Sequence, residues 1–141
     1  MITQDLVESL HGHNYYLEIE LFGKLNSNGM IFNYLSLDKS IKAIILEWDH
    51  YTLLPRLNKQ IKYEEKGDNI EIRYGDRFYS IPTNEIRFLE CQSVTTEVLN
   101  ELFLQRIKVF LNQKSKPDNI KMVKVTIWET PMYAASRTIC L

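Results

Sequence analysis

Two stretches in which apolar and polar residues alternate constrain the fold of this chain more than any other feature. In residues 13–23 (HNYYLEIELFG) every second residue from Tyr15 to Leu21 is apolar, the period of a strand that buries one face. Residues 120–129 (IKMVKVTIWE) alternate in the same way, and 136–141 (SRTICL) is a candidate for a last strand. Residues 13–23 therefore predict a half-buried strand, and residues 120–129 predict a second strand.

Helical spacing of apolar residues predicts two helices. The first begins near Ser36, which can cap its N-terminus, and ends near Asp49 and His50. The second runs from about Thr95 to Asn112 and carries a broad apolar face. Residues 69–82 (NIEIRYGDRFYSIP) read as two short strands joined by a turn. This order of elements predicts an α+β fold with an antiparallel sheet.

Composition narrows the class of partner. The chain has 141 residues, the length of one domain, and a formal net charge of -1. That charge gives no argument for nucleic acid or an anionic membrane as a partner. The two cysteines form no CxxC motif, and no apolar run is long enough to span a bilayer. We therefore expect a single-domain cytoplasmic protein.

His11-Gly12-His13 is the sharpest local motif. In an extended chain, residues two apart point to the same side, so both imidazoles can reach one ion. Zinc accepts nitrogen ligands, and a catalytic zinc usually keeps an open position beside three protein ligands. The alternative is a pair of surface histidines at the start of a strand.

Further polar residues are candidates for chemistry. Asp49 can orient the ring of His50, as in a tuned general acid or base, although a polar helix end is the simpler alternative. Glu129 ends a strand, where its carboxylate can accept two parallel N–H bonds from a guanidine-like edge of a ligand or simply be an edge charge. Thr95 and Thr96 are interpreted, taken alone, as helix caps.

These pieces together carry a family resemblance. The ordered segments ESLHGHNY (8–15), GMIFNYLSLDKSIK (29–42), WDHYTLLP (48–55), SVTTEVLNELF (93–103) and VTIWETP (125–131) resemble the 6-pyruvoyltetrahydropterin synthase family. Only about 57–90 falls outside the resemblance, and it looks like an inserted hairpin of the kind found in archaeal members. We therefore expect one pterin synthase-like domain over 1–141.

The resemblance implies a fold, a cofactor and a substrate. The fold is the tunnelling fold, in which antiparallel sheets with two helices on one face join into an oligomeric barrel. Such proteins are usually homo-oligomers, as dimers of trimers, with active sites between subunits. The expected substrate is 7,8-dihydroneopterin triphosphate, a small-molecule pterin. The expected cofactor is Zn2+, which would bind the side-chain hydroxyls of the substrate and act as a Lewis acid.

The resemblance also implies a role for each site residue. His11 and His13 match two of three zinc ligands, Asp49 and His50 a proton-relay pair, Glu129 the pterin anchor, and Thr95 and Thr96 the wall of the same pocket. Candidates for contacts to the triphosphate, without ranking, are Lys24, Lys39, Lys42 and Arg137.

Two departures from the family pattern bear on the activity. The family's catalytic cysteine before HGH is absent, and Glu8 matches a variant, ExLHGHNY, in which glutamate is the base. A carboxylate is a weaker base than a thiolate, so burial would have to raise its pKa. The family's third zinc histidine lies on a strand before this point, so either the chain as printed lacks that strand or the zinc site is incomplete.

The resemblance leaves several activities open. The glutamate variant favours cleavage of the side chain with release of 6-hydroxymethyl-7,8-dihydropterin. The alternatives are a 6-pyruvoyltetrahydropterin synthase and a 6-carboxytetrahydropterin synthase that serves the modification of tRNA bases. A non-catalytic protein that binds pterin or purine would also show a missing cysteine, although it would have no reason to keep the whole set of polar residues.

Overall fold

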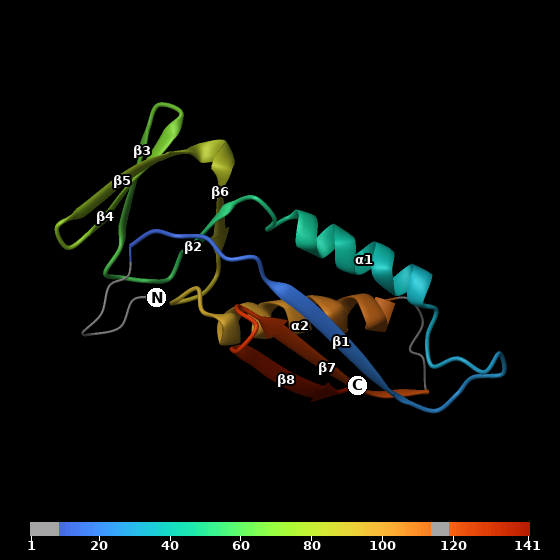
Figure 1. Ribbon diagram of the computed structural model, residues 1–141. Coiled ribbons are helices and arrows are strands. Elements are labelled where there is room, and N and C mark those ends of the chain that lie inside the picture. Colours follow the sequence, from blue (N-terminus) through green and yellow to red (C-terminus); the bar gives the residue numbers. More distant parts are fainter. Residues whose placement is uncertain (1–8, 114–118) are drawn as a thin grey trace. The chain divides into compact units, whose positions relative to one another are not determined.

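The computed structural model describes residues 9–113 and 119–141, shown in Figure 1. The chain divides into two compact units, and their described parts are Glu47–Val94 on one side and residues 9–46 with 95–113 and 119–141 on the other. The prediction of one domain with an insertion at about 57–90 stays a prediction.

The second unit is built on a three-stranded antiparallel sheet. Its strands are β1 (Tyr16–Gly23), β7 (Ile120–Trp128) and β8 (Ala134–Cys140), with β7 in the middle. The predicted strands therefore exist, and the predicted antiparallel pairing is confirmed. The register sets Tyr16 opposite Trp128 and Ala134 opposite Trp128, so the end of β7 meets both neighbours.

Two helices accompany this sheet. Helix α2 (Thr96–Gln113) packs against β7 and β8, and α1 (Tyr34–Leu46) packs beside α2 (Figure 1). The core between α2 and β7 is formed by fully or almost fully buried apolar side chains: Leu99, Phe103, Leu104, Ile107, Leu111, Val123, Val125 and Ile127. Alternation on β7 and helical spacing on α2 thus supply the two faces of one core. Within the described ranges, neither helix is long and apolar enough to cross a membrane.

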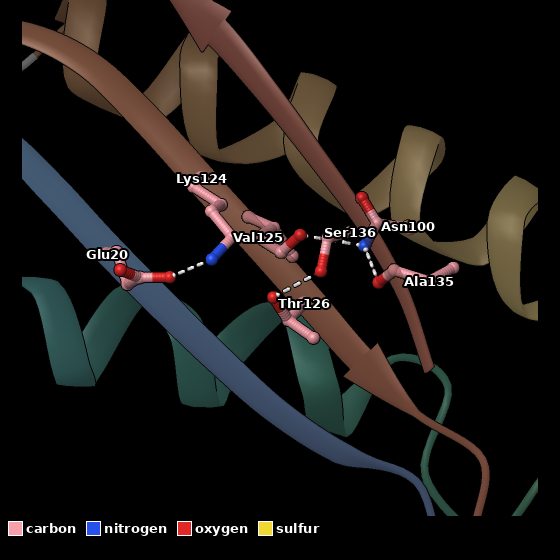
Figure 2. A network of polar contacts seen from close by, with 7 residues as sticks. All are labelled: Glu20, Asn100, Lys124, Val125, Thr126, Ala135 and Ser136. Carbon is pink, nitrogen blue, oxygen red and sulfur yellow. Dashed lines mark hydrogen bonds and ion pairs between the residues drawn. The ribbon is translucent and has the colours of Figure 1, made fainter. Parts of the chain in front are cut away.

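Asn100 ties the helix to the sheet, as Figure 2 shows. Its Nδ2 donates to the main-chain carbonyls of Val125, at 2.9 Å, and Ala135, at 2.7 Å. The side chain is 1% exposed, and its Oδ1 has no hydrogen-bond partner among the described residues. On the other face of the sheet, a 2.5 Å ion pair joins Lys124 to Glu20. The side chain of Asn100 thus joins α2 to both β7 and β8.

The first helix begins and ends earlier than the sequence predicts. Asn33, not Ser36, supplies the cap, since its Oδ1 accepts from the backbone N–H of Leu35 at 2.9 Å and its carbonyl accepts from Ser36. An asparagine three residues upstream can satisfy the first free N–H groups, so Ser36 falls inside the first turn. The helix ends at Leu46, and residues 47–50 are turns.

A close backbone approach fixes the start of β7. The carbonyl of Asn119 accepts the Lys24 N–H at 2.7 Å, and its side-chain Nδ2 donates to the carbonyls of Lys24 and Ile31. A Cβ at Gly23 would lie 1.9 Å from the Asn119 carbonyl oxygen. This contact is far inside van der Waals distance, so the crossing of the two segments requires glycine at this position.

The first unit holds the remaining strands. β2 (Thr52–Pro55) pairs in parallel with β6 (Ile86–Leu89), and β3 (Lys62–Lys66), β4 (Asn69–Tyr74) and β5 (Arg77–Pro82) form an antiparallel meander before the short turn η1 (Thr83–Glu85). The predicted hairpin at Gly75 is confirmed, with a positive φ of 58° at that glycine. The sequence did not predict β2, β3 or β6. Their core is Leu54, Ile70, Ile72 and Ile86.

Candidate active site

The two histidines of the HGH motif converge. His11 and His13 lie in the extended segment just before β1, and their Nε2 atoms are 2.8 Å apart. The Nδ1 of His11 lies 2.7 Å from the Ser9 carbonyl, so this nitrogen carries a proton and donates it. In the neutral ring, the Nε2 of His11 is then an acceptor. The predicted same-side geometry is confirmed, while a role in metal binding stays a prediction.

Glu129 joins the same cluster. Its Oε1 lies 3.3 Å from the Nε2 of His13. The register explains the contact, because β1 begins at Tyr16 opposite the last residue of β7, Trp128. The residues just before β1 therefore lie next to those just after β7. Two segments more than a hundred residues apart in sequence supply neighbouring polar groups.

Tyr15 is a neighbour that the sequence did not single out as a site residue. Its ring centroid is 5.8 Å from that of His13, with the rings tilted by 48°. Burial, and secondly the charge of Glu129, raise the pKa of the Tyr15 hydroxyl. The signal was present in the alternation of His11, His13 and Tyr15, which set all three on one side of an extended chain.

The two threonines lie at the start of α2. The carbonyl of Thr95 accepts the Leu99 N–H at 2.9 Å, and its Oγ1 accepts weakly from Val98 at 3.4 Å, so Thr95 caps the helix as interpreted. Thr96 is buried, and its Oγ1 finds no partner in the described part of the chain. The N-terminal end of α2 lies at the same end of the sheet as the β7–β8 turn that follows Glu129 (Figure 1).

Asp49 and His50 form their own pair in the other unit. The Nδ1 of His50 is 3.0 Å from the Asp49 Oδ1, and the His50 side chain is 91% exposed. His50 is the one non-glycine residue with a positive φ, 61°, among the residues that the structure describes. A left-handed backbone costs an ordinary residue about 1 kcal/mol, and such conformations cluster at functional sites. The pair has the geometry predicted for it, and its role stays a prediction.

A zinc ion fits these residues in part. The two Nε2 atoms point to one another, and the hydrogen bond from His11 to Ser9 is the kind of support that orients a ligating imidazole. Within residues 9–113 and 119–141, no three His, Cys, Asp or Glu side chains form a group that could hold a metal. The described residues therefore contain two candidate ligands for a zinc ion, His11 and His13, and no third beside them.

The remaining candidates are the proposed base, the basic residues for the triphosphate and the buried cysteine. Glu8 lies outside the described residues. Of the candidates for phosphate contacts, Lys42 is paired with Asp38 at 2.7 Å, and Arg137 is paired with Glu101. Burial raises the pKa of the Cys91 thiol, so this cysteine is not an activated nucleophile.

Comparison with known proteins identifies the family. Residues 3–138 match the family described as 6-pyruvoyl tetrahydropterin synthase. A protein of Pyrococcus horikoshii, provisionally named a 6-carboxy-5,6,7,8-tetrahydropterin synthase, is 34% identical over 132 residues, which cover 94% of this chain and 76% of that protein. The 6-carboxy-5,6,7,8-tetrahydropterin synthase of Rickettsia felis is 30% identical over 91% of this chain and 82% of its own length.

Solved structures show the same architecture. The crystal structure of the 6-pyruvoyl tetrahydropterin synthase of Plasmodium vivax superposes with a TM-score of 0.92 at 23% identity, and it covers 99% of this chain and 87% of its own. This likeness confirms the predicted α+β tunnelling fold. The chain belongs to the 6-pyruvoyl tetrahydropterin synthase family of pterin-processing lyases.

Proposed function

We propose that this chain is a zinc-dependent lyase that acts on 7,8-dihydroneopterin triphosphate and releases 6-hydroxymethyl-7,8-dihydropterin. The observation that carries the proposal is the convergence of two imidazoles and one carboxylate: His11, His13 and Glu129. The imidazoles suit a metal that holds the hydroxylated side chain, and the carboxylate suits the guanidine-like edge of the ring. The two ends of such a substrate would therefore be held by neighbouring groups.

Each of the chain's site residues has a separate role in the proposed reaction. Glu129 accepts the N–H groups of the ring and fixes its position. Glu8 takes a proton from a side-chain hydroxyl, which starts the cleavage, and Asp49 orients His50 to return a proton. Zinc, when bound, lowers the pKa of the hydroxyls that it contacts. Thr95 and Thr96 line the ring at the start of α2.

The assignment of Glu8 as the base has support from a relative of the same fold. Two solved variants of the Plasmodium vivax 6-pyruvoyltetrahydropterin synthase carry alanine or cysteine in place of a catalytic glutamate. In this chain Glu8 is the acidic residue in the position that the variant motif gives to that base. We expect Glu8→Gln to lower turnover by about 10² to 10⁴ while zinc content is kept. Full activity in Glu8→Gln would refute the assignment.

A second product has a specific observation in its favour. Several relatives, among them that of Aquifex aeolicus at 28% identity, are named 6-carboxy-5,6,7,8-tetrahydropterin synthases. Incubation of the purified protein with 7,8-dihydroneopterin triphosphate, followed by mass spectrometry, distinguishes the hydroxymethyl, carboxy and pyruvoyl products. A hydroxymethyl product supports our proposal, a carboxy product supports the alternative, and an unconsumed substrate in zinc-loaded protein contradicts both.

The zinc assignment has its own test. We expect replacement of His11 and His13 by alanine to abolish stoichiometric zinc in purified protein, because both imidazole nitrogens are removed. Elemental analysis measures this directly, and His50→Ala is the matched control, since it also removes an imidazole. Unchanged zinc in the double variant would show that the metal site lies elsewhere.

A further inference from the structure

The turn that presents His50 is closed by the next residue, Tyr51. The backbone N–H of Tyr51 donates to the carbonyl of Trp48 at 3.3 Å, which closes a four-residue turn with His50 at its third position. The φ of His50 is 61°, a left-handed value that an ordinary residue populates about 5-fold less or lower. Because the His50 side chain is 91% exposed, packing does little to fix its direction. The position of the imidazole therefore depends on the turn and on the contact with Asp49.

A cation lies over the ring of Tyr51. The guanidinium carbon of Arg87 is 3.5 Å from the centroid of that ring, well inside the roughly 6 Å over which an aromatic face attracts a cation. The register explains the contact, because β2 and β6 run in parallel with Leu53 opposite Arg87. Residues two apart in an extended chain point to the same side. The side chain of Tyr51, two residues before Leu53, is therefore directed to the side that carries Arg87.

The backbone of Arg87 has a rigid support. Its Nη1 donates to the carbonyl of Ile86 at 2.9 Å. Ile86 is 4% exposed and belongs to the core that this unit forms with Ile70 and Ile72 of β4. Both β4 and β6 lie within 57–90, the segment that falls outside the family resemblance. This additional segment thus supplies a fixed cation beside the turn of Asp49 and His50.

We propose that Arg87 is a positioning residue, which holds the ring of Tyr51 and thereby keeps His50 in the conformation that returns a proton to the substrate. The proposal rests on the proposed role of His50 in the lyase reaction. It adds that the inserted segment takes part in that reaction through one side chain. Arg87 needs no contact with the substrate, because it acts through Tyr51 on the backbone at His50.

The size of the effect follows from the contact. A cation over an aromatic ring favours the stacked arrangement by about 2-fold at exposed sites and by about 30-fold after desolvation. Arg87 and Tyr51 are both half-buried, so we expect an intermediate factor of about 3 to 10. Because the left-handed backbone of His50 is disfavoured without support, most of this factor should appear in the population of the productive turn, and hence in kcat.

The test compares two variants that remove the contact from either side. Arg87→Met removes the cation, and Tyr51→Leu removes the ring. In zinc-loaded protein with 7,8-dihydroneopterin triphosphate, we expect each variant to lower kcat by about 3- to 10-fold with an unchanged KM, because the contact acts on His50 and not on the anchor of the pterin ring. The double variant should lose no more than either single variant, since both remove the same contact.

Two further variants serve as controls. Tyr51→Phe keeps the aromatic face and should keep kcat within about 2-fold. Arg73→Met removes another arginine of the same unit, whose guanidinium carbon lies 4.5 Å from the centroid of the Phe78 ring, and should leave kcat unchanged. Loss of one stacked arginine as such is thereby separated from loss of the one beside His50.

NMR gives a readout that does not depend on turnover. The Cα and Cβ chemical shifts of a residue follow its backbone conformation, so they report the positive φ of His50. In the purified protein without substrate, we expect Arg87→Met to move these two shifts of His50 toward extended values. Arg73→Met should leave them unchanged.

The outcomes separate the positioning role from the activity. A wild-type kcat in Arg87→Met, an equal loss in Arg73→Met, losses that multiply in the double variant, or unchanged His50 shifts in Arg87→Met would each overturn the positioning role. Absence of turnover by the wild-type protein would instead refute the proposed function. In that case, altered His50 shifts in Arg87→Met would still support the contact of Arg87 with Tyr51 as the support of the turn.

Discussion

Replacement of Asn100 by aspartate tests how the helix is joined to the sheet. The two side chains have almost the same shape, but the substitution replaces the Nδ2 donor with an acceptor. In the wild-type protein, the Nδ2 of Asn100 lies 2.9 Å from the carbonyl oxygen of Val125 and 2.7 Å from that of Ala135. A carboxylate would face two oxygens in a position that is 1% exposed. We therefore expect the aspartate to be neutral in the folded protein and charged in the unfolded chain.

The expected decrease in the free energy of unfolding can be worked out from these contacts. Keeping the carboxyl protonated at pH 7, against an ordinary pKa of about 3.9, costs about 4 kcal/mol. Two hydrogen bonds of about 1 kcal/mol each are lost, and the single O–H of the acid restores one of them. The free energy of unfolding at pH 7 should therefore fall by about 5 kcal/mol, a large share of the stability of a typical domain.

The pH dependence makes the reasoning refutable. Because the folded-state pKa of the new carboxyl is raised above its unfolded value, the folded state binds more protons between the two, and stability falls as pH rises. Relative to wild type, the variant should regain about 1.4 kcal/mol per pH unit on going from pH 7 toward pH 4. Urea unfolding at several pH values measures this. Gln105→Glu, the same chemical change at an exposed position of α2, is the control. An Asn100→Asp protein as stable as the control at pH 7 would refute the role of Asn100 in joining α2 to the sheet.

Three further predictions concern the backbone and the assembly. Gly23→Ala should lower the free energy of unfolding by about 2 kcal/mol or more, because its Cβ would lie 1.9 Å from the Asn119 carbonyl oxygen. Urea unfolding measures this, and an unchanged stability would contradict the required close approach of Gly23 to Asn119. His50→Asn should keep the stability within about 0.5 kcal/mol, since asparagine accepts a positive φ, while turnover falls by about 10² or more; loss of fold together with activity would make His50 a structural residue. Light scattering should show an oligomer, and a stable monomer at micromolar concentration would contradict shared active sites.

The strands with an apolar alternation or a clear turn between them were predictable, and the short strands β2 and β6 were not. Alternation located β1 and β7 because apolar side chains recur at every second position along much of each strand. β2 and β6 have four residues each and pair in parallel with one another, so neither contains enough residues to show a period. The cap of α1 was misplaced for a similar reason, since two polar residues three positions apart, Asn33 and Ser36, are equally good candidates by local chemistry.

The residues of the site could be listed from the sequence, but their contacts could not. Same-side placement of His11 and His13 follows from a local rule, and the structure agrees. The contact of His13 with Glu129 depends on the register of β1 against β7, which no local pattern fixes. The positive φ of His50 likewise depends on the turn that joins α1 to β2.

Four of the described site residues share one structural property, since they lie one to three positions beyond the end of a regular element. His13 precedes β1, Glu129 follows β7, Thr95 precedes α2, and His50 lies in the turn before β2. A residue inside a strand has its backbone committed to the ladder and its side chain committed to one face. A residue one to three positions beyond the end keeps the position that the rigid element gives it, while its side chain and backbone can turn toward a ligand. The same placement explains the contact of Glu129 with His13, because the register of β7 against β1 fixes where the backbone of Glu129 lies.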